Sequence, residues 1–243
     1  MSRSSMALGA TNGEPSQTDD YSDNPVVNGL GNLIVGYNEQ SETYATARKG
    51  SHNIIVGTGN NYSSFGGLVA GTTNAVAAPF ASVTGGSDNL ASGFANSISG
   101  GQNNITTSYY NSISGGSHNT VQNSSYASIS GGENGFARGQ GASVSGGIAN
   151  QANGQDASVT GGFSNQANGT NAAIAGGLEG TALGNNSAIS GGSGVFTGGS
   201  YSPKYDQFNH LIGSNYDGAV PGAPNGYTWD GGIYFSPLPI SIP

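Results

Sequence analysis

The chain lacks cysteine and has few charged residues, and each shortage excludes a class of protein. None of its 243 residues is a cysteine, so neither a disulfide framework nor thiolate chemistry is available. Charged residues make up only 7%, and five basic residues against 13 acidic ones leave a formal net charge of −8. Because no basic stripe exists to neutralise phosphates, we expect no nucleic-acid binding.

Long apolar runs are also missing. No stretch approaches the roughly 18 consecutive apolar residues that read as a membrane span, so we expect no membrane insertion. Residues 1–16 lack the apolar centre of a secretory signal peptide. We expect an extracellular location, at a cell surface or on a virion. The chain would then be a fragment, or would leave the cell by a route that the sequence does not show.

Glycine is abundant, and it falls in a fixed repeat. The chain has 44 glycines. The segment Ala-Ser-Val-Thr-Gly-Gly at 81–86 returns with small changes about every 15 residues, so doubled glycines recur in register with an Ile or Val. Copies begin at residues 96, 111, 127, 142, 157, 172 and 187. Low charge with strict periodicity favours an ordered array over disorder, and glycine does not recur at every third position as in collagen. Each unit must stack on its neighbours to bury its apolar residues.

The apolar anchor of each repeat predicts the fold. The anchors are Ile34, Ile55, Val69, Val83, Ile98, Ile113, Ile129, Val144, Val159, Ile174 and Ile189. A second half-unit reads Asn-x-Ala-x-Gly, as at 150–154 and 165–169. Side chains alternate between the two faces of a strand, so an inward Val83 places Ser82 and Thr84 outward. We predict an all-β parallel β-roll, a β-solenoid, with about 15 residues and two short strands per rung, where a rung is one full turn of the chain.

Three segments follow from this pattern. Residues 1–27 are expected to be an extended lead-in or a remnant of an expression vector, and residues 28–199 the repeat domain. Residues 200–243 hold many aromatic residues and six of the prolines without the period. We predict that they form a C-terminal cap over the last strand, because an exposed strand edge invites aggregation.

Asparagine recurs at one position of the repeat, at Asn89, Asn104, Asn119, Asn150 and Asn165. Stacked amides can hydrogen-bond along an axis, as they do in cross-β assemblies. The alternative is that each is a turn residue that tolerates an unusual φ. Both interpretations stay open at this stage.

Catalytic and metal-binding patterns are weak. His52, His118 and His210 lack metal-ligand spacing, and each is expected to be a surface residue. The acidic residues Asp88, Glu133, Asp156 and Glu179 do not share one repeat position, as calcium solenoids require. Asp206, Asp217 and Asp230 are expected to be turn residues. We predict no catalytic residues, no cofactor, no metal and no enzymatic activity.

Two outward features are candidate interaction sites. The first is a ladder of hydroxyl side chains: Ser82, Thr84, Ser97, Ser99, Ser112, Ser114, Ser128, Ser130, Ser143, Ser145, Ser158 and Thr160. An ice-binding face requires such an array, whereas a polar solvated face or a subunit contact is the alternative.

The second feature is apolar. Phe80, Tyr110 and Tyr126 share the corner before the inward strand, whereas Ile148, Phe163 and Leu178 share the position after Gly-Gly. Exposed apolar stripes mark interfaces. A single large apolar residue per rung is also a thin core, since ordering a residue costs roughly 1–2 kcal/mol while a buried Ile or Val returns about 1.5–3 kcal/mol. We therefore predict a homo-oligomer held by these residues and by the region around Trp229.

The alternating apolar-x-Gly half-units at 30–199 resemble the head domains of trimeric autotransporter adhesins. The resemblance implies a left-handed roll, a homotrimer and binding of a host-surface protein or glycan. The chain departs from that family in its period of 15 rather than 14, its doubled glycine, and its lack of a heptad stalk and membrane anchor. Units such as 119–121 are similar to the β-roll of grass ice-binding proteins. Residues 28–38 resemble the start of Ser/Gly-repeat segments in bacterial and phage surface proteins.

These observations lead to one expected function and one alternative. The expected function is a non-enzymatic, surface-exposed structural or adhesive domain, at the head or tip of a bacterial adhesin or phage tail fibre. The alternative is a monomeric ice-binding solenoid that uses the Ser-x-Ser/Thr ladder.

Overall fold

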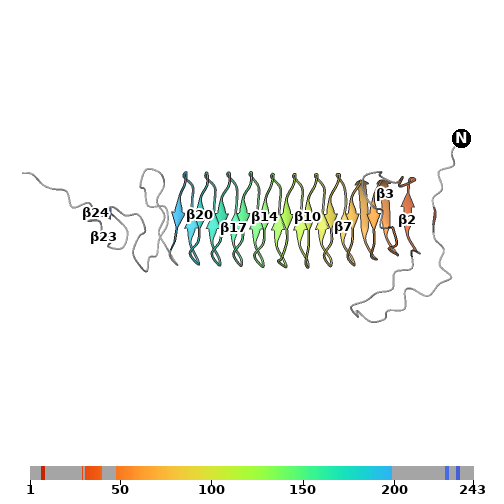
Figure 1. Ribbon diagram of the computed structural model, residues 1–243, viewed down its shortest axis with the longest axis horizontal. Helices are drawn as coiled ribbons and strands as arrows, with labels where there is room; N and C mark the ends of the chain where they lie inside the picture. The colour runs from red at the N-terminus through yellow and green to blue at the C-terminus, as the bar shows by residue number, and fades with distance from the viewer. Residues whose placement is uncertain are drawn as a thin grey trace, which may run out of the picture.

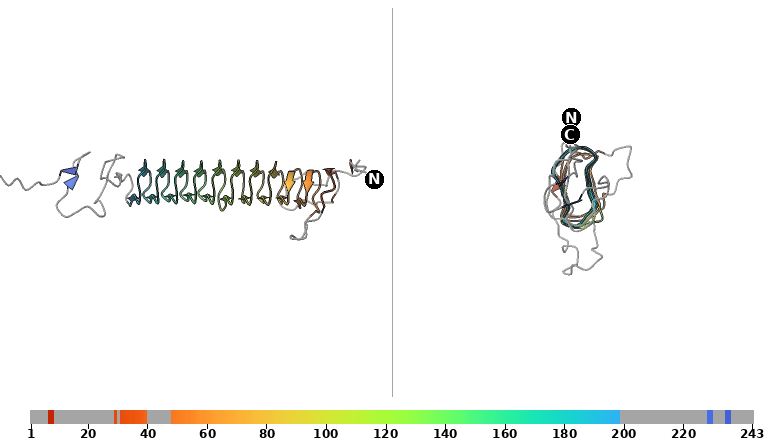
Figure 2. Two further views of the ribbon diagram at one scale, coloured as in Figure 1. Left: turned by 90° about the horizontal axis from the view of Figure 1, so that it is seen from above. Right: turned by 90° about the vertical axis from the view of Figure 1, so that its left-hand side faces the viewer.

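The computed structural model describes residues 7–8, 29, 31–39, 48–198, 228–229 and 234–235 of the chain. Their secondary structure consists of β-strands, bridges, bends and turns. Successive rungs, each one full turn of the chain, stack into a straight rod (Figure 1). Viewed along the rod, the rungs superimpose as a flattened ring (Figure 2).

One long side of the ring is a sheet of 12 strands, called the first sheet. Its order is β1-β2-β3-β5-β7-β9-β11-β13-β15-β17-β19-β21. The strands are β1 (Ala7–Leu8), β2 (Leu33–Val35), β3 (Ile54–Thr58), β5 (Leu68–Thr72), β7 (Ser82–Val83), β9 (Ser97–Ile98), β11 (Ser112–Ile113), β13 (Ser128–Ile129), β15 (Ser143–Val144), β17 (Ser158–Val159), β19 (Ala173–Ile174) and β21 (Ala188–Ile189). All neighbours pair in parallel except β1, which pairs with β2 in the antiparallel sense.

The opposite side is a parallel sheet of ten strands, called the second sheet, in the order β22-β20-β18-β16-β14-β12-β10-β8-β6-β4. The strands are β4 (Asn61–Tyr62), β6 (Ala75–Val76), β8 (Leu90–Ala91), β10 (Ile105–Thr106), β12 (Thr120–Val121), β14 (Phe136–Ala137), β16 (Gln151–Ala152), β18 (Gln166–Ala167), β20 (Thr181–Ala182) and β22 (Phe196–Thr197). A separate antiparallel pair joins β23 (Thr228–Trp229) to β24 (Tyr234–Phe235).

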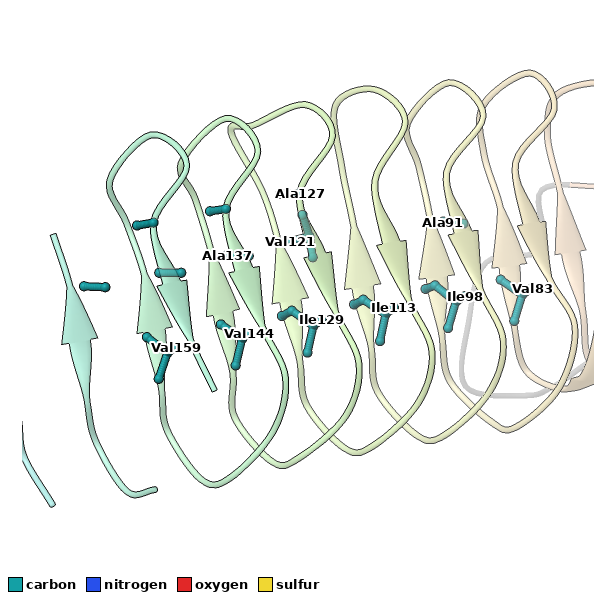
Figure 3. Close-up of a cluster of buried hydrophobic side chains, with 14 of the residues drawn as sticks. Val83, Ala91, Ile98, Ile113, Val121, Ala127, Ile129, Ala137, Val144 and Val159 are labelled. Carbon is teal, nitrogen blue, oxygen red and sulfur yellow. The ribbon is translucent and has the colours of Figure 1, made fainter. Parts of the chain in front are cut away.

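The predicted anchors form one column inside the rod. Each of them pairs in register with the next, as in Val83 with Ile98 and Ile98 with Ile113. From Ile55 to Ile189 every anchor is buried, and Figure 3 shows several of them pointing to the same side of their strands. The prediction of a parallel β-solenoid with about 15 residues per rung is therefore confirmed.

A second buried column faces the first. Its members come from the second sheet: Tyr62, Val76, Ala91, Thr106, Val121, Ala137, Ala152, Ala167, Ala182 and Thr197. The interior thus holds one Ile or Val opposite a residue that is mostly smaller. Since strand side chains alternate, every neighbour of these residues along the strand points outward.

The two glycines of each Gly-Gly pair from 85–86 to 191–192 have different roles. The second has a positive φ, 83° at Gly101, and a Cβ there would collide with the carbonyl oxygen of Gly116 in the next rung. The first, such as Gly100, has no positive φ and open space around its Cβ position. Only the second glycine is required by the packing of one rung on the next.

Buried asparagines form a ladder along the corner that leads from the first sheet to the second. The N–H of Asn104 donates to Oδ1 of Asn89 (2.9 Å), and the N–H of Asn119 donates to Oδ1 of Asn104 (3.0 Å). The Asn104 amide also donates to the carbonyl oxygens of Gly100 and Gly116. Of the two interpretations left open by the sequence, the ladder is the correct one.

The ladder is longer than the five recurring positions. It begins at Asn38, continues through Asn60 and Asn74, breaks at Gly135 and resumes at Asn150. A shorter one runs along the opposite corner, where the N–H of Asn111 donates to Oδ1 of Asn96 (2.8 Å) and that of Ala127 to Oδ1 of Asn111 (2.9 Å). Sequence reasoning missed this second ladder.

Several predictions fall outside the described residues. The lead-in at 1–27 is described only at β1, and the expected cap at 200–243 only at β23 and β24. Residues Asp206, His210, Asp217 and Asp230 also lie outside the described part of the chain.

Candidate functional site

The hydroxyl ladder is a regular grid on the outer surface of the first sheet. Its first row runs through Ser82, Ser97, Ser112, Ser128, Ser143 and Ser158, which pair in register from rung to rung. The second row lies two residues further on, from Thr84 to Thr160, and every member is exposed. Neighbouring members of one row lie about 4.8 Å apart along the rod. The two rows lie about 6.6 Å apart along the strand direction.

The grid is bounded at both ends by apolar residues. Toward the N-terminus the outward positions carry Ile54, Val56 and Leu68, and Val56 is 37% exposed. Toward the C-terminus they carry Ala173 and Ala175. The grid therefore spans six rungs of the first sheet and no more.

Phe80, Tyr110 and Tyr126 lie in one exposed row, together with two rings that sequence reasoning missed. The complete aromatic row is Phe65, Phe80, Phe94, Tyr110 and Tyr126. Neighbouring ring centroids are 5.3 to 5.6 Å apart, and the first three contacts are edge-to-face. Three of the rings are 44% to 62% exposed.

Phe65 and Phe94 were missed because they stand one position earlier in the repeat. The left-handed corner residue of their rungs is Gly66 or Ala95, at φ 68° and 52°. Aromatic side chains at either of two adjacent corner positions therefore lie in the same row. A search for an aromatic residue at either position, rather than at one fixed phase, would have found all five.

The aromatic row ends at an irregular rung. Ile113 pairs with Ile129, a step of 16, and the additional residue lies in the corner between Val121 and Ala127. There Tyr110 and Tyr126 stack face to face, with 4° between their planes. An inserted corner residue therefore coincides with the change in ring orientation.

Ile148, Phe163 and Leu178 form the aliphatic row, named for Ile148 and Leu178, on the other corner. Parallel bridges connect Ile148 to Phe163 and Phe163 to Leu178, and all three side chains are 42% to 46% exposed. The aromatic row lies on the corner before the first sheet, over the earlier rungs. The aliphatic row lies on the corner after the first sheet, over the later ones.

Titratable side chains in the described part of the chain are scattered. His118 Nδ1 lies 2.7 Å from Ser117 Oγ and its Nε2 lies 3.3 Å from Asn103 Nδ2, in an exposed position. No group of three or more His, Cys, Asp or Glu residues suited to a metal ion occurs among the described residues. The described ranges also contain no helical segment with the length and apolarity of a bilayer crossing.

Comparison with known proteins adds no family. No protein-family model and no curated protein matches the chain. Trp229, the remaining predicted interface residue, lies in β23, and the placement of its side chain is outside what the structure describes.

Proposed function

We propose that this chain is a non-enzymatic structural or adhesive rod, exposed outside the cell, at the head or tip of a bacterial adhesin or phage tail fibre. The observation that supports it best is the pair of exposed apolar rows along a straight solenoid. Exposed contiguous apolar surface on a soluble protein marks an interaction site. The parallel β-solenoid is compatible with this role and with the resemblance to adhesin heads.

The first partner we propose for these rows is another copy of the chain. Large apolar side chains occupy outward corner positions although the interior is narrow, so self-association would bury surface that folding leaves exposed. Among oligomers, a trimer is favoured by the resemblance to autotransporter adhesin heads. A host-surface protein or glycan is the proposed external ligand.

The size of the rows limits what they can do alone. Five aromatic rings in consecutive rungs span about 19 Å along the rod. A stable interface buries about 800 Å² per partner, which a row of this length and one side chain in width does not provide. An oligomer must therefore also bury an adjoining face of a sheet, and the flat hydroxyl grid borders both corners.

Sedimentation velocity tests the self-association. We expect the wild type to sediment as a trimer at micromolar concentration and Phe163→Ser to shift it toward monomer. Leu183→Ser is the matched control, because Leu183 is 44% exposed on the outer surface of the second sheet, away from both rows. A wild-type monomer, or equal effects of both substitutions, would contradict the proposal.

The hydroxyl grid supports ice binding as a second candidate. The favouring observation is the in-register pairing of its rows over six rungs, which presents hydroxyls at two fixed spacings. Thermal hysteresis of the wild type, with Ser114→Tyr as the disrupting variant and Asn153→Tyr on the opposite sheet as the control, measures this directly. Hysteresis by a monomer that only Ser114→Tyr abolishes would favour ice binding over the adhesive role.

A further inference from the structure

A groove of about 420 Å³ lies on the outer surface of the second sheet, away from the two apolar rows and the hydroxyl grid. It runs across strands β4, β6, β8 and β10. Asn61, Ala75, Leu90 and Ile105 line it and pair in register from rung to rung. Its volume lies within the range of small-ligand sites, which is about 300–1,000 Å³.

The floor of the groove is apolar over three rungs only. Ala75, Leu90 and Ile105 provide it, whereas the next outward positions are Thr120, Phe136 and Gln151. Ile105 is 36% exposed. The floor therefore suits an aliphatic chain of a few carbons laid along it.

One wall of the groove is polar and carries its charge. Asp88 is the one charged side chain among the described lining residues, and Asn103 lies beside it in the next rung. Oδ1 of Asp88 lies 2.6 Å from the Thr73 hydroxyl, which also lies 2.7 Å from the carbonyl oxygen of Thr72, so the carboxylate keeps oxygen lone pairs with which to accept. Because Asn103 Nδ2 faces His118 Nε2, its amide oxygen is also left to accept.

From this arrangement we infer that the groove binds a lysine side chain presented by a partner protein. The aliphatic stem lies on Leu90 and Ile105, and the ammonium donates to Asp88 Oδ2. The Asp88 carboxylate, the one charged group in the described lining, matches a cationic group that only donates. We infer lysine rather than arginine because its ammonium is a compact point charge on a flexible four-carbon stem, whereas the pairing of arginine with a carboxylate is planar and bidentate.

The inference rests on the adhesive part of the proposed function, since it specifies the chemistry that a bound partner offers. The net charge of −8 attracts such a basic segment before contact is made. Self-association through the apolar rows does not involve the groove. Failure of lysine binding would therefore leave the sedimentation result unchanged. Likewise, a wild-type monomer in sedimentation would leave lysine binding unchanged.

Backbone amide spectra of the full chain test this inference with N-acetyl-lysine methylamide as the probe. We expect concentration-dependent shifts at Ala75, Leu90 and Ile105 that saturate in the millimolar range. N-acetyl-norleucine methylamide, which has a stem of the same length without the ammonium, is expected to bind at least about fivefold more weakly, because charge-assisted hydrogen bonds are the stronger ones.

Two variants complete the design. Asp88→Asn removes the charge while keeping a residue that tolerates φ 57°, and we expect it to weaken lysine binding about fivefold. Asp156→Asn makes the same change at φ 53° on the opposite corner and should leave binding unaltered. Equal binding of the norleucine probe, undiminished binding to Asp88→Asn with its fold intact, tighter binding of the arginine analogue, or no shifts at the groove would each overturn the inference.

Discussion

In the rungs up to Tyr126 the second core column is mixed, with Tyr62, Val76, Ala91, Thr106 and Val121, whereas the four rungs that follow all contribute alanine, from Ala137 to Ala182. The asparagine ladder changes in parallel. It is unbroken from Asn38 to Asn119 in the earlier rungs. In the later rungs Gly135 replaces the asparagine before Asn150, and Gly180 replaces the one after Asn165. Both halves keep the same backbone register. The comparison shows that the fold depends on backbone ladders and corner geometry, while side-chain filling varies.

The largest expected effect is one that both halves share. Gly101→Ala and Gly162→Ala each place a Cβ against the next carbonyl oxygen at φ 83° or 87°, so both should lose about 2–5 kcal/mol of unfolding free energy. Gly100→Ala, with open space, should stay within about 0.5 kcal/mol of the wild type. Urea unfolding measures all three. A small loss of unfolding free energy in Gly162→Ala alone would show that the later rungs rearrange to accommodate the Cβ and that the earlier ones do not.

The asparagine ladder provides the next largest effect. Asn104→Ala and Asn165→Ala each remove one buried and two partly buried hydrogen bonds and should cost about 2–3 kcal/mol. Asn153, whose amide bonds Asn168 on the outer surface, is the control and should cost under about 1 kcal/mol on change to Ala. Thermal unfolding resolves the difference. If Asn165→Ala were as mild as Asn153→Ala, the broken part of the ladder would not contribute to stability.

Hydrogen exchange tests the difference in core filling. Val121 in β12 and Ala167 in β18 occupy the same position of the repeat, and both are buried. The valine buries two more carbon atoms than the alanine, which corresponds to about 1.6 kcal/mol. In a solenoid, stability is the sum of neighbouring rungs, so the deficit stays local. We therefore expect amides of β12 to exchange about tenfold more slowly than those of β18. Equal rates in both strands would mean that the rod opens as one unit.

The smallest effect comes from strained corners. Ala95 and Ala149 have φ 52° and 58°, a region that costs a residue with a Cβ about 1–2 kcal/mol. Ala95→Gly and Ala149→Gly should therefore stabilise the protein by about 0.5 kcal/mol, because glycine's larger loss of chain entropy offsets part of the gain. Ala77→Gly, whose φ is ordinary, should destabilise it by about 0.5–1 kcal/mol. Destabilisation by all three would contradict this account.

The amino-acid sequence by itself determined the period, the inward column and the outward positions of this protein. These follow from two local rules, the alternation of side chains along a strand and the need of each rung to bury its anchor on the next. For this reason Ile98 and Ser97 could be assigned to opposite faces without any coordinates. The recurrence of Asn104 suggested a ladder, although turn formation explained the same residue equally well.

What only the tertiary structure decided lies between rungs and at the corners. Phe94 joins the aromatic row because two adjacent corner positions project to one edge, and repeat phase alone does not show this. Gly100 and Gly101 look alike in the sequence, but only Gly101 lies against a neighbouring carbonyl. The groove at Asp88 exists because that side chain stands above the floor made by Leu90 and Ile105 from successive rungs. Such contacts depend on distances across the stack, which the backbone sets only after the corners have folded.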